Sequence, residues 1–400
     1  MPDAGRGSGT TPSTETGAAP GTGRPPRRVP LSVLDLVPVS AGSSSAEALR
    51  DSVDLSVRAE AAGYARYWLA EHHMNPGLAG SSPHAMLAAV AAATRSIRVG
   101  SAATLIGNHS ALQVAEAFGT VTGLYGPRFD LGLGRSPMPP KRPAGAGADA
   151  AAPADAEARV VDGLLVPARA VMFKDRSRAQ LQARLLRRGD TEVAPFGETV
   201  DDLLAFLDGT YADPDIGPIA APPSDGSTVE VWIHGSSAGE SARVAGSRGL
   251  PFGANYHSTP WGVLDAVAAY REHFVPGVLA APHVIVSADV LVADTDAEAR
   301  RLASGFARWV LSIRSGRGAI PYPAPDDEAA APLDAAELAQ VQDRLDTRIV
   351  GDPATVTRKL ETLRRVTGAD ELLITTTAHD PAARVRSYEL LAEAWGPRGL

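Results

Sequence analysis

The densest group of residues able to do chemistry is Trp68-Leu69-Ala70-Glu71-His72-His73, which ends an apolar run. A histidine in this position can act as a general base near neutral pH. Because neighbouring residues of a strand point to opposite faces, we do not expect His72 and His73 to face one ligand together. The same geometry argues against a metal site formed by the pair. A structural histidine, hydrogen-bonded within a loop, is the alternative for either residue alone.

Three further segments could hold a flat, phosphorylated ligand such as FMN. The small residues from Gly100 to Leu105 would let a planar ring approach the backbone, although tight helix packing needs the same residues. Arg135 is placed to hold a phosphate or a carboxylate. Ser236, Ser237 and Ser241 surround an expected helix start, where free N–H groups favour an anion. An ordinary serine N-cap is the alternative for this last segment.

Eight short apolar runs typical of strands alternate with segments of helical periodicity. The expected strands are residues 31–39, 64–70, 97–105, 129–134, 229–234, 250–255, 283–292 and 371–376. This alternation predicts an α/β fold with a parallel sheet, closed into a single (β/α)8 TIM barrel. The segments named above follow these strands, so they should meet at the C-terminal face of the barrel, where barrel enzymes carry their active sites.

The expected helix starts carry recognisable capping signals. Two of them are capping boxes, Ser44 with Glu47 and Thr295 with Glu298. Four others place a polar residue before a proline: Ser82-Pro83, Thr259-Pro260, Asp352-Pro353 and Asp380-Pro381. These signals fix where the helices begin and support the strand–helix alternation.

Two stretches break the alternation, about residues 137–228 and 316–347. The first contains helical segments near 176–188 and 198–208. Insertions between barrel strands usually decorate the C-terminal face, where they can roof an active site. A flexible surface excursion without a catalytic role is an equal alternative for residues 137–154.

The composition limits both the location and the chemistry. The chain has 400 residues, 44% of them hydrophobic, and a net charge of −8, which indicates neither a nucleic-acid nor a membrane-surface partner. It has no cysteine, which excludes disulfides, thiolate nucleophiles and iron–sulfur clusters. Redox chemistry would therefore need a borrowed cofactor.

Residues 1–29 are rich in Gly, Pro, Ser and Thr and predict a disordered tail before a barrel domain of residues 30–400. Arg27-Arg28 invites a twin-arginine export interpretation, but Asp35 interrupts the apolar run that follows. With no stretch long enough to span a membrane as a helix, we expect a cytoplasmic protein.

In their order and spacing, these segments resemble the luciferase-like monooxygenases, the bacterial-luciferase-like flavin-dependent family. The resemblance covers about residues 30–136 nearly without gaps, and resumes at Ser236 to Pro251 and at Val350 to Tyr388. It rests on Tyr67 to His73, Gly80 to Pro83, Arg98 to Ala103 and Arg128 to Arg135.

The resemblance implies roles for individual residues. His72 matches the catalytic histidine of the family, and Ala102-Ala103 matches a non-proline cis peptide beneath the flavin ring. Arg135 and the turn with Ser236, Ser237 and Ser241 match contacts to the flavin phosphate. His73, Tyr256 and His257 would line the substrate cavity. In place of the cysteine that precedes this arginine in bacterial luciferase, the chain has Gly134.

The activity that the resemblance implies is a two-component flavin-dependent monooxygenase. A separate flavin reductase would supply FMNH2, and O2 would form a C4a-hydroperoxyflavin that oxygenates a small organic substrate. A homodimer is expected on the same basis. Because residues 137–228 do not match luciferase, light emission is not predicted, and neither the substrate nor the type of oxygenation follows from the sequence.

Three alternatives stay open. Relatives with this fold use the deazaflavin F420 for hydride transfer without O2. A metal-dependent barrel hydrolase could use His72, His73, His234 and His283, although the HxH spacing is missing. A non-catalytic flavin-binding relative would keep the cofactor site without turnover.

Overall fold

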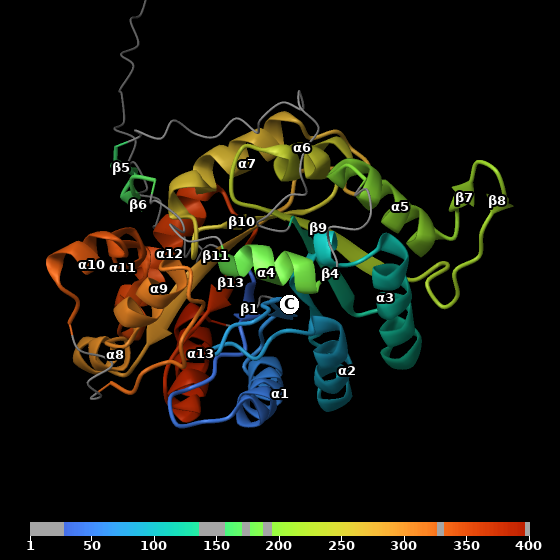
Figure 1. Ribbon diagram of the computed structural model, residues 1–400. Coiled ribbons are helices and arrows are strands. Elements are labelled where there is room, and N and C mark those ends of the chain that lie inside the picture. Colours follow the sequence, from blue (N-terminus) through green and yellow to red (C-terminus); the bar gives the residue numbers. More distant parts are fainter. Residues whose placement is uncertain (1–27, 136–156, 170–176, 187–193, 326–331, 397–400) are drawn as a thin grey trace, which may run out of the picture.

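The computed structural model describes residues 28–135, 157–169, 177–186, 194–325 and 332–396 (Figure 1). The expected tail therefore lies outside the described residues, except for Arg28 and Val29. Arg28 Nη1 donates to the Ala394 carbonyl at 2.7 Å, and Trp395 Nε1 donates to the Val29 carbonyl at 2.8 Å. These two residues are thus held against the end of the last helix. Residues 137–154 also lie outside the described part.

Eight parallel strands close into a barrel, as the sequence predicts. They are β1 (Leu31–Asp35), β2 (Arg66–Leu69), β3 (Arg98–Leu105), β4 (Phe129–Gly134), β9 (Val229–Gly235), β10 (Phe252–Asn255), β11 (Val284–Val292) and β13 (Glu371–Thr375). The ring runs in this order, and β13 pairs with β1 to close it. A short strand that the sequence did not predict, β12 (Ile349–Gly351), pairs in parallel with the last three residues of β11. The chain is therefore a TIM barrel.

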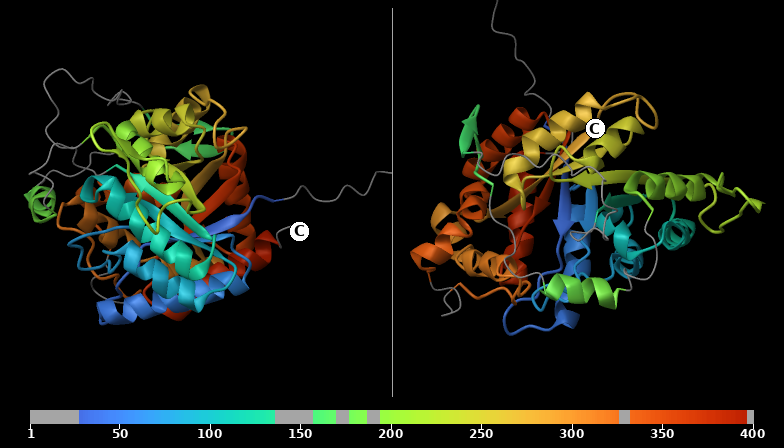
Figure 2. Two further views of the ribbon diagram at one scale, coloured as in Figure 1. Left: turned by 90° about the vertical axis from the view of Figure 1, so that its right-hand side faces the viewer. Right: turned by 45° about the horizontal axis from the view of Figure 1, so that its top comes forward.

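Helices surround the barrel (Figures 1 and 2). They include α1 (Ser45–Ala61), α2 (Pro83–Ala93), α3 (Ala111–Tyr125), α6 (Glu240–Ser247), α7 (Val263–Glu272), α8 (Asp296–Leu302), α12 (Pro353–Thr367) and α13 (Pro381–Trp395). Ser44 and Glu47 form the predicted capping box of α1. Asp352 and Asp380 cap α12 and α13. The Thr295 side chain accepts the Glu298 N–H, but the predicted capping box is only half formed, because the Glu298 carboxylate pairs with Arg301 instead.

Two of the predicted caps are wrong in detail. The helix after Ser82 begins at Pro83 as expected, but the Ser82 side chain makes no capping hydrogen bond. Its ψ is 78°, whereas the capping Ser44 has ψ 158°. Thr259, with ψ 60°, also does not cap, and a 3-10 turn (Pro260–Gly262) precedes α7. Both backbones depart from the extended conformation that aims an N-cap side chain at the helix.

Strand alternation separates an outer core from an inner one. Tyr67 and Leu69 of β2 face the outer cluster between strands and helices. Trp68 faces the barrel interior, where it packs with Trp232 and Ile285. The Trp68 and Trp232 rings meet edge to face, with centroids 5.1 Å apart. Bulky side chains thus fill the middle of the barrel and leave polar groups at its two ends.

The two insertions contain their own short elements. The first holds the hairpin β5 (Arg159–Val161) and β6 (Leu164–Val166), the predicted helices α4 (Ser177–Leu185) and α5 (Phe196–Asp208), and the hairpin β7 (Ala212–Asp213) and β8 (Gly217–Pro218). Helix α9 (Phe306–Arg314) lies between α8 and the second insertion, which itself contains α10 (Ala335–Ala339) and α11 (Gln342–Thr347). Within the described residues, no helix has the length and apolar character needed to cross a membrane.

Candidate functional site

Glu71 organises the loops after β2 and β3. Its carboxylate accepts hydrogen bonds from His73 Nε2 at 2.8 Å, Asn108 Nδ2 at 2.7 Å and the Leu105 N–H at 2.8 Å. Burial would raise the pKa of Glu71, but these bonds and those from His109 hold the pKa well below its usual range. His73 is therefore engaged in the structure of this loop.

His72 is the member of the pair that is left available. Its Nδ1 is buried and has no hydrogen-bond partner. Burial lowers the pKa of His72 to about 4, so the imidazole is neutral at pH 7. A hollow of about 480 Å³ opens beside it, between Met74 and the start of α1 at Ser45. The sequence left open which of His72 and His73 would serve a ligand, and this geometry favours His72.

His234, at the end of β9, is a second buried imidazole in the barrel. Its Nε2 has no partner, and burial lowers its pKa to about 4. A Cβ at Gly132 would lie 2.7 Å from Nε2, and a Cβ at Gly253 would lie 2.3 Å from Nδ1. Sequence reasoning considered His234 only as a metal ligand. The signal for its place is the glycine in each of the flanking strands, β4 and β10.

His257 completes a group of neutral imidazoles. Its Nδ1 lies 2.6 Å from the Ser287 hydroxyl. Burial is the largest cause that lowers the pKa of His257 to about 3, and the positive charge of Arg344 adds to it. His72, His234 and His257 lie at or just beyond the ends of β2, β9 and β10, so all three belong to the C-terminal end of the barrel.

The Ala102–Ala103 peptide is cis, as the resemblance implied for this position. The pairing of β3 with β4 shifts register between Ser101 and Thr104, around this peptide. A Cβ at Gly134 would lie 2.9 Å from the Ala103 Cβ. The small residues here therefore keep two neighbouring strands close, and Gly134 leaves no space for a cysteine unless Ala103 moves.

Arg135 and the serine turn meet on one rim of the barrel, as expected. Arg135 Nη1 contacts Glu240 Oε2 at 3.0 Å. Glu240 is the first residue of α6, Ser241 follows it and is buried, and Ser236 and Ser237 are half-buried in the preceding turn. Sequence reasoning did not single out Glu240, although its place in the first turn of α6 was visible.

Tyr256 has a different environment from its neighbour His257. Its ring packs in the outer core, and its hydroxyl donates to the Leu165 carbonyl of β6 at 2.8 Å. The Tyr256 hydroxyl therefore links the end of β10 to the first insertion by a hydrogen bond.

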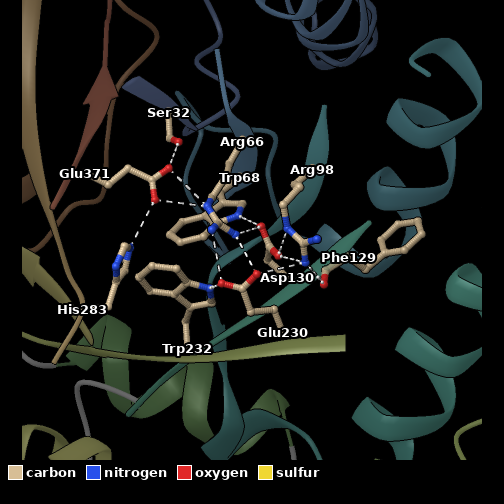
Figure 3. Close-up of polar contacts among 10 residues, drawn as sticks. All are labelled: Ser32, Arg66, Trp68, Arg98, Phe129, Asp130, Glu230, Trp232, His283 and Glu371. Carbon is tan, nitrogen blue, oxygen red and sulfur yellow. Dashed lines mark hydrogen bonds and ion pairs between the residues drawn. The ribbon is translucent and has the colours of Figure 1, made fainter. Parts of the chain in front are cut away.

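The opposite, N-terminal end of the barrel is closed by a charged network (Figure 3). Arg66 lies 2.8 Å from Asp130 and 3.2 Å from Glu371. Asp130 also accepts from Arg98 Nε at 2.7 Å and from Trp68 Nε1 at 2.9 Å. Arg66, Arg98 and Glu371 are the first residues of β2, β3 and β13, and Asp130 is the second residue of β4, so their side chains meet at the N-terminal end of the barrel (Figure 3).

This network rules out the four-histidine metal site. His283 precedes β11 and lies 3.8 Å from Glu371, at the N-terminal end of the barrel, whereas His72 follows β2 at the C-terminal end. The predicted hydrolase set of His72, His73, His234 and His283 therefore does not come together. In the described part of the chain, no group of three or more His, Asp or Glu side chains is arranged to hold a metal ion.

Fold and geometry together define a TIM-barrel protein with a candidate ligand site at the C-terminal face. The family model of the luciferase-like monooxygenases matches residues 29–174 and 175–371, so the chain belongs to this family.

Curated relatives match over nearly the whole chain. The uncharacterized protein YvbT of Bacillus subtilis is 36% identical over 92% of this chain and 97% of its own length. A luciferase-like monooxygenase of Escherichia coli strain K12 is 32% identical, covering 91% and 96%. A shorter match, 41% identical over 27% of this chain and 32% of the relative, is to the N-acetyl-S-alkylcysteine monooxygenase of B. subtilis.

Solved structures share the fold. Apo-MsnO8 superposes with a TM-score of 0.72 at 30% identity, covering 93% of this chain and all of that one. The oxygenating constituent of 3,6-diketocamphane monooxygenase from Pseudomonas putida, in complex with FMN, gives 0.62 at 20% identity over 93% and 99%. An F420-dependent secondary alcohol dehydrogenase, with an F420-acetone adduct, gives 0.59 at 13% over 92% and 99%. The last two show a common fold only.

Proposed function

We propose that the protein is a two-component, flavin-dependent monooxygenase that uses externally supplied FMNH2 and O2 to oxygenate a small organic substrate. The observation that carries this proposal is the pair of buried imidazole nitrogens without partners, His72 Nδ1 and His234 Nε2, at the C-terminal end. A buried polar atom left unpaired costs free energy, which a ligand or water at that place would recover.

The residues on the rim fit the cofactor. Arg135 and the turn with Ser236, Ser237 and Ser241 would bind the FMN phosphate, and the first turn of α6 adds N–H groups. Glu240 holds the Arg135 guanidinium beside this turn at 3.0 Å. Ala102 and Ala103 leave the backbone open to a planar ring. When bound, reduced FMN supplies the electrons that activate O2.

The chain's own residues would manage protons and water. His72 is neutral at pH 7, because its pKa is about 4, and can accept a proton at Nδ1. Trp68 and Trp232 fill the barrel below the site and exclude water from that side. His257 would contact substrate, and His73 would position the loop through Glu71. A flavin reductase is the partner that this proposal requires. We also propose that the protein is a homodimer.

The second candidate is hydride transfer with F420, because a structural neighbour with the same fold is F420-dependent. The names of the relatives favour a monooxygenase. Both cofactors carry a phosphate, so the rim alone does not separate them.

Anaerobic equilibrium binding of FMNH2 and of F420H2 distinguishes the candidates. We expect FMNH2 to bind more tightly, and Arg135→Ala to weaken it roughly 10-fold or more because a charge-assisted contact is lost. Arg248→Ala is the matched control, since Arg248 pairs with Asp201 at 2.6 Å at the far end of α6. Preference for F420H2 would replace the monooxygenase with a hydride-transfer enzyme, and binding of neither cofactor would refute the flavin assignment.

Turnover tests the role of His72. With a flavin reductase and O2, His72→Ala should retain FMNH2 binding but lower kcat by roughly 100-fold, a typical effect of losing a general base. An unchanged kcat would contradict a catalytic role, and would favour a flavin-binding protein if the wild type also lacks turnover.

A further inference from the structure

A cluster of five charged side chains lies beside the C-terminal end of β11. It contains three guanidinium groups and two carboxylates, and the exposed fraction of each side chain is between 3% and 10%. Its members are Asp289, Arg314, Asp343, Arg344 and Arg348. The buried cluster therefore carries one positive charge in excess of its negative charges.

Four of the five groups satisfy one another. Arg314 pairs with Asp343 through both of its terminal nitrogens and also donates to the Gln340 carbonyl at 2.5 Å. Arg348 Nε donates to Asp289 Oδ1 at 2.9 Å, and its Nη2 donates to a backbone carbonyl at the same distance. Arg348 is thus held firmly by Asp289.

Arg344 is the group in excess. Its nearest carboxylate oxygen is Asp289 Oδ2 at 3.6 Å, too far for a hydrogen bond, and Asp289 already serves Arg348. Within the described residues its guanidinium donates no hydrogen bond. Burial is the largest influence on Arg344 and lowers its pKa to about 10. An uncompensated buried charge is costly unless an anion joins it.

The cluster faces the candidate site. Asp289 follows Ser287 by two residues on β11, so both side chains point to the same side of the strand, and Ser287 contacts His257. Arg344 lies in α11, which packs against the 3-10 turn Pro260–Gly262 that follows His257. Its positive charge also contributes to the lowered pKa of His257. A buried hydroxyl without a partner, Thr375 Oγ1, lies beside the cluster, because Thr375 of β13 pairs with Asp289 of β11.

Aromatic side chains form the other wall of the cluster. The Arg344 guanidinium lies 5.5 Å from the centre of the Phe306 ring. Phe306 packs on Trp309, which in turn packs on Tyr322. An anion at Arg344 would therefore have an apolar surface beside it.

We infer that Arg344 binds a carboxylate of the substrate, so that the monooxygenase acts on small organic acids with an apolar body. The planar guanidinium matches a carboxylate with two parallel hydrogen bonds. Arg344 comes from the second insertion, beside β11, whereas Arg135 directly follows β4, and β9 and β10 lie between those strands. Arg344 is thus separate from the phosphate rim. The oxygenation of such an acid rests on the proposed function, whereas the binding of a carboxylate at Arg344 does not.

The test compares Arg344→Met with wild type in thermal unfolding at constant ionic strength. The probes are hexanoate and benzoate, each with its uncharged amide, hexanamide and benzamide. We expect at least one carboxylate to raise the Tm of wild type in a concentration-dependent manner, and to raise it more than its amide does. Neither carboxylate should raise the Tm of Arg344→Met. Without ligand, Arg344→Met should keep or raise the wild-type Tm, because the cluster becomes neutral.

Arg314→Met is the matched control, because it breaks a complete buried pair and should lower the Tm by roughly 5 °C or more. A loss in Arg344→Met equal to that of Arg314→Met would make Arg344 structural and overturn the inference. The inference would also be overturned if the Tm of wild type responded equally to hexanoate and hexanamide, and equally to benzoate and benzamide. FMNH2 binding should change less than 2-fold, and a loss above 10-fold would reassign Arg344 to the cofactor. If wild type binds a carboxylate but not FMNH2, the proposed function fails and the anion site stands.

Discussion

At the N-terminal end of the barrel, Arg66 contacts Asp130 and Glu371, and Trp68 donates to Asp130 from within the core. At the C-terminal end, His72 Nδ1 and His234 Nε2 have no partner, and Arg344 shares a carboxylate at 3.6 Å. Most of these residues lie at or just beyond the tips of the same eight strands, and Arg344 lies in α11 of the second insertion. The difference lies in whether folding alone satisfies the polar groups.

This contrast separates stability from function within one barrel. The N-terminal network is complete without any ligand, so its residues stabilise the closed ring. The C-terminal groups carry an energetic cost in the free protein that ligand binding would recover. Substitutions at the two ends should therefore have different, and in places opposite, effects on unfolding.

The largest effect is expected for Asp130→Ala. This change leaves Arg98 with the carboxylate of Glu230, at 3.2 Å, and Trp68 Nε1 without its acceptor, so the free energy of unfolding should fall by about 4 kcal/mol. Equilibrium unfolding in urea measures this change in the free energy of unfolding. FMNH2 affinity of the folded fraction should not change, because the network lies at the other end. A loss below about 1 kcal/mol would contradict the structural role of the network.

Gly253→Ala should lower the free energy of unfolding by about 3 kcal/mol, the upper part of the range for overpacked cores. The reason is that the new Cβ would lie 2.3 Å from His234 Nδ1. Because His234 supplies the three nearest atoms, the double variant with His234→Ala should recover most of the loss. Additive losses in this double-mutant cycle would show that the clash is not with His234.

The pH dependence of stability should differ in sign between the two ends. His234 has a pKa of about 4 in the folded protein, below its ordinary value near 6.5. The unfolded chain therefore takes up the proton first, so stability is fully present above about pH 6.5 and falls as pH drops toward 4, by about 2 kcal/mol at pH 5. His234→Gln should flatten this part of the curve.

His283 behaves in the opposite way. The carboxylate of Glu371, 3.8 Å from His283 Nε2, raises its pKa, so its contribution is present at low pH and is lost as pH rises through the raised pKa. His283→Gln should therefore steepen the acid loss that His234→Gln flattens. Urea unfolding across pH 4.5–8 compares the variants, and parallel curves would contradict the contrast between the ends.

The smallest effect is expected for Tyr256→Phe. It removes the hydroxyl that donates to Leu165 O at 2.8 Å and should cost about 1 kcal/mol. Hydrogen exchange of the hairpin β5 and β6 should increase while the barrel strands stay protected. A large change in KM without this local effect would instead assign Tyr256 to substrate binding.

Sequence patterns predicted the eight strands because each is a short apolar run followed by a helix start. The residues 176–188 and 198–208 were predicted as helices for the same reason, and α4 and α5 confirm them. The hairpins and β12 were missed because two- or three-residue strands leave no periodicity to detect. Strand alternation could not decide between His72 and His73, because both residues lie beyond the end of β2 at Leu69.

The N-terminal network and the excess charge at Arg344 could not be predicted in the same way. The network joins residues from different strands, such as Arg66, Asp130 and Glu371, and each looks like a single charge at the edge of an apolar run. Arg344 lies in the second insertion, where no family motif was matched, and its role depends on Asp289 being already paired. Only the closed barrel brings these charges together.

The closure of the ring also has a consequence for synthesis. β1 pairs with β13, and the buried carboxylate of Asp35 meets its ion-pair partner Arg384 across 349 residues of sequence. At about 5–20 residues per second, the ribosome needs roughly 20–70 s to supply that partner. During this interval one edge of β1 and the Asp35 charge stay exposed. The nascent chain should thus depend on chaperones until β13 and α13 emerge, and slowing translation late in the message should lower the yield of soluble protein.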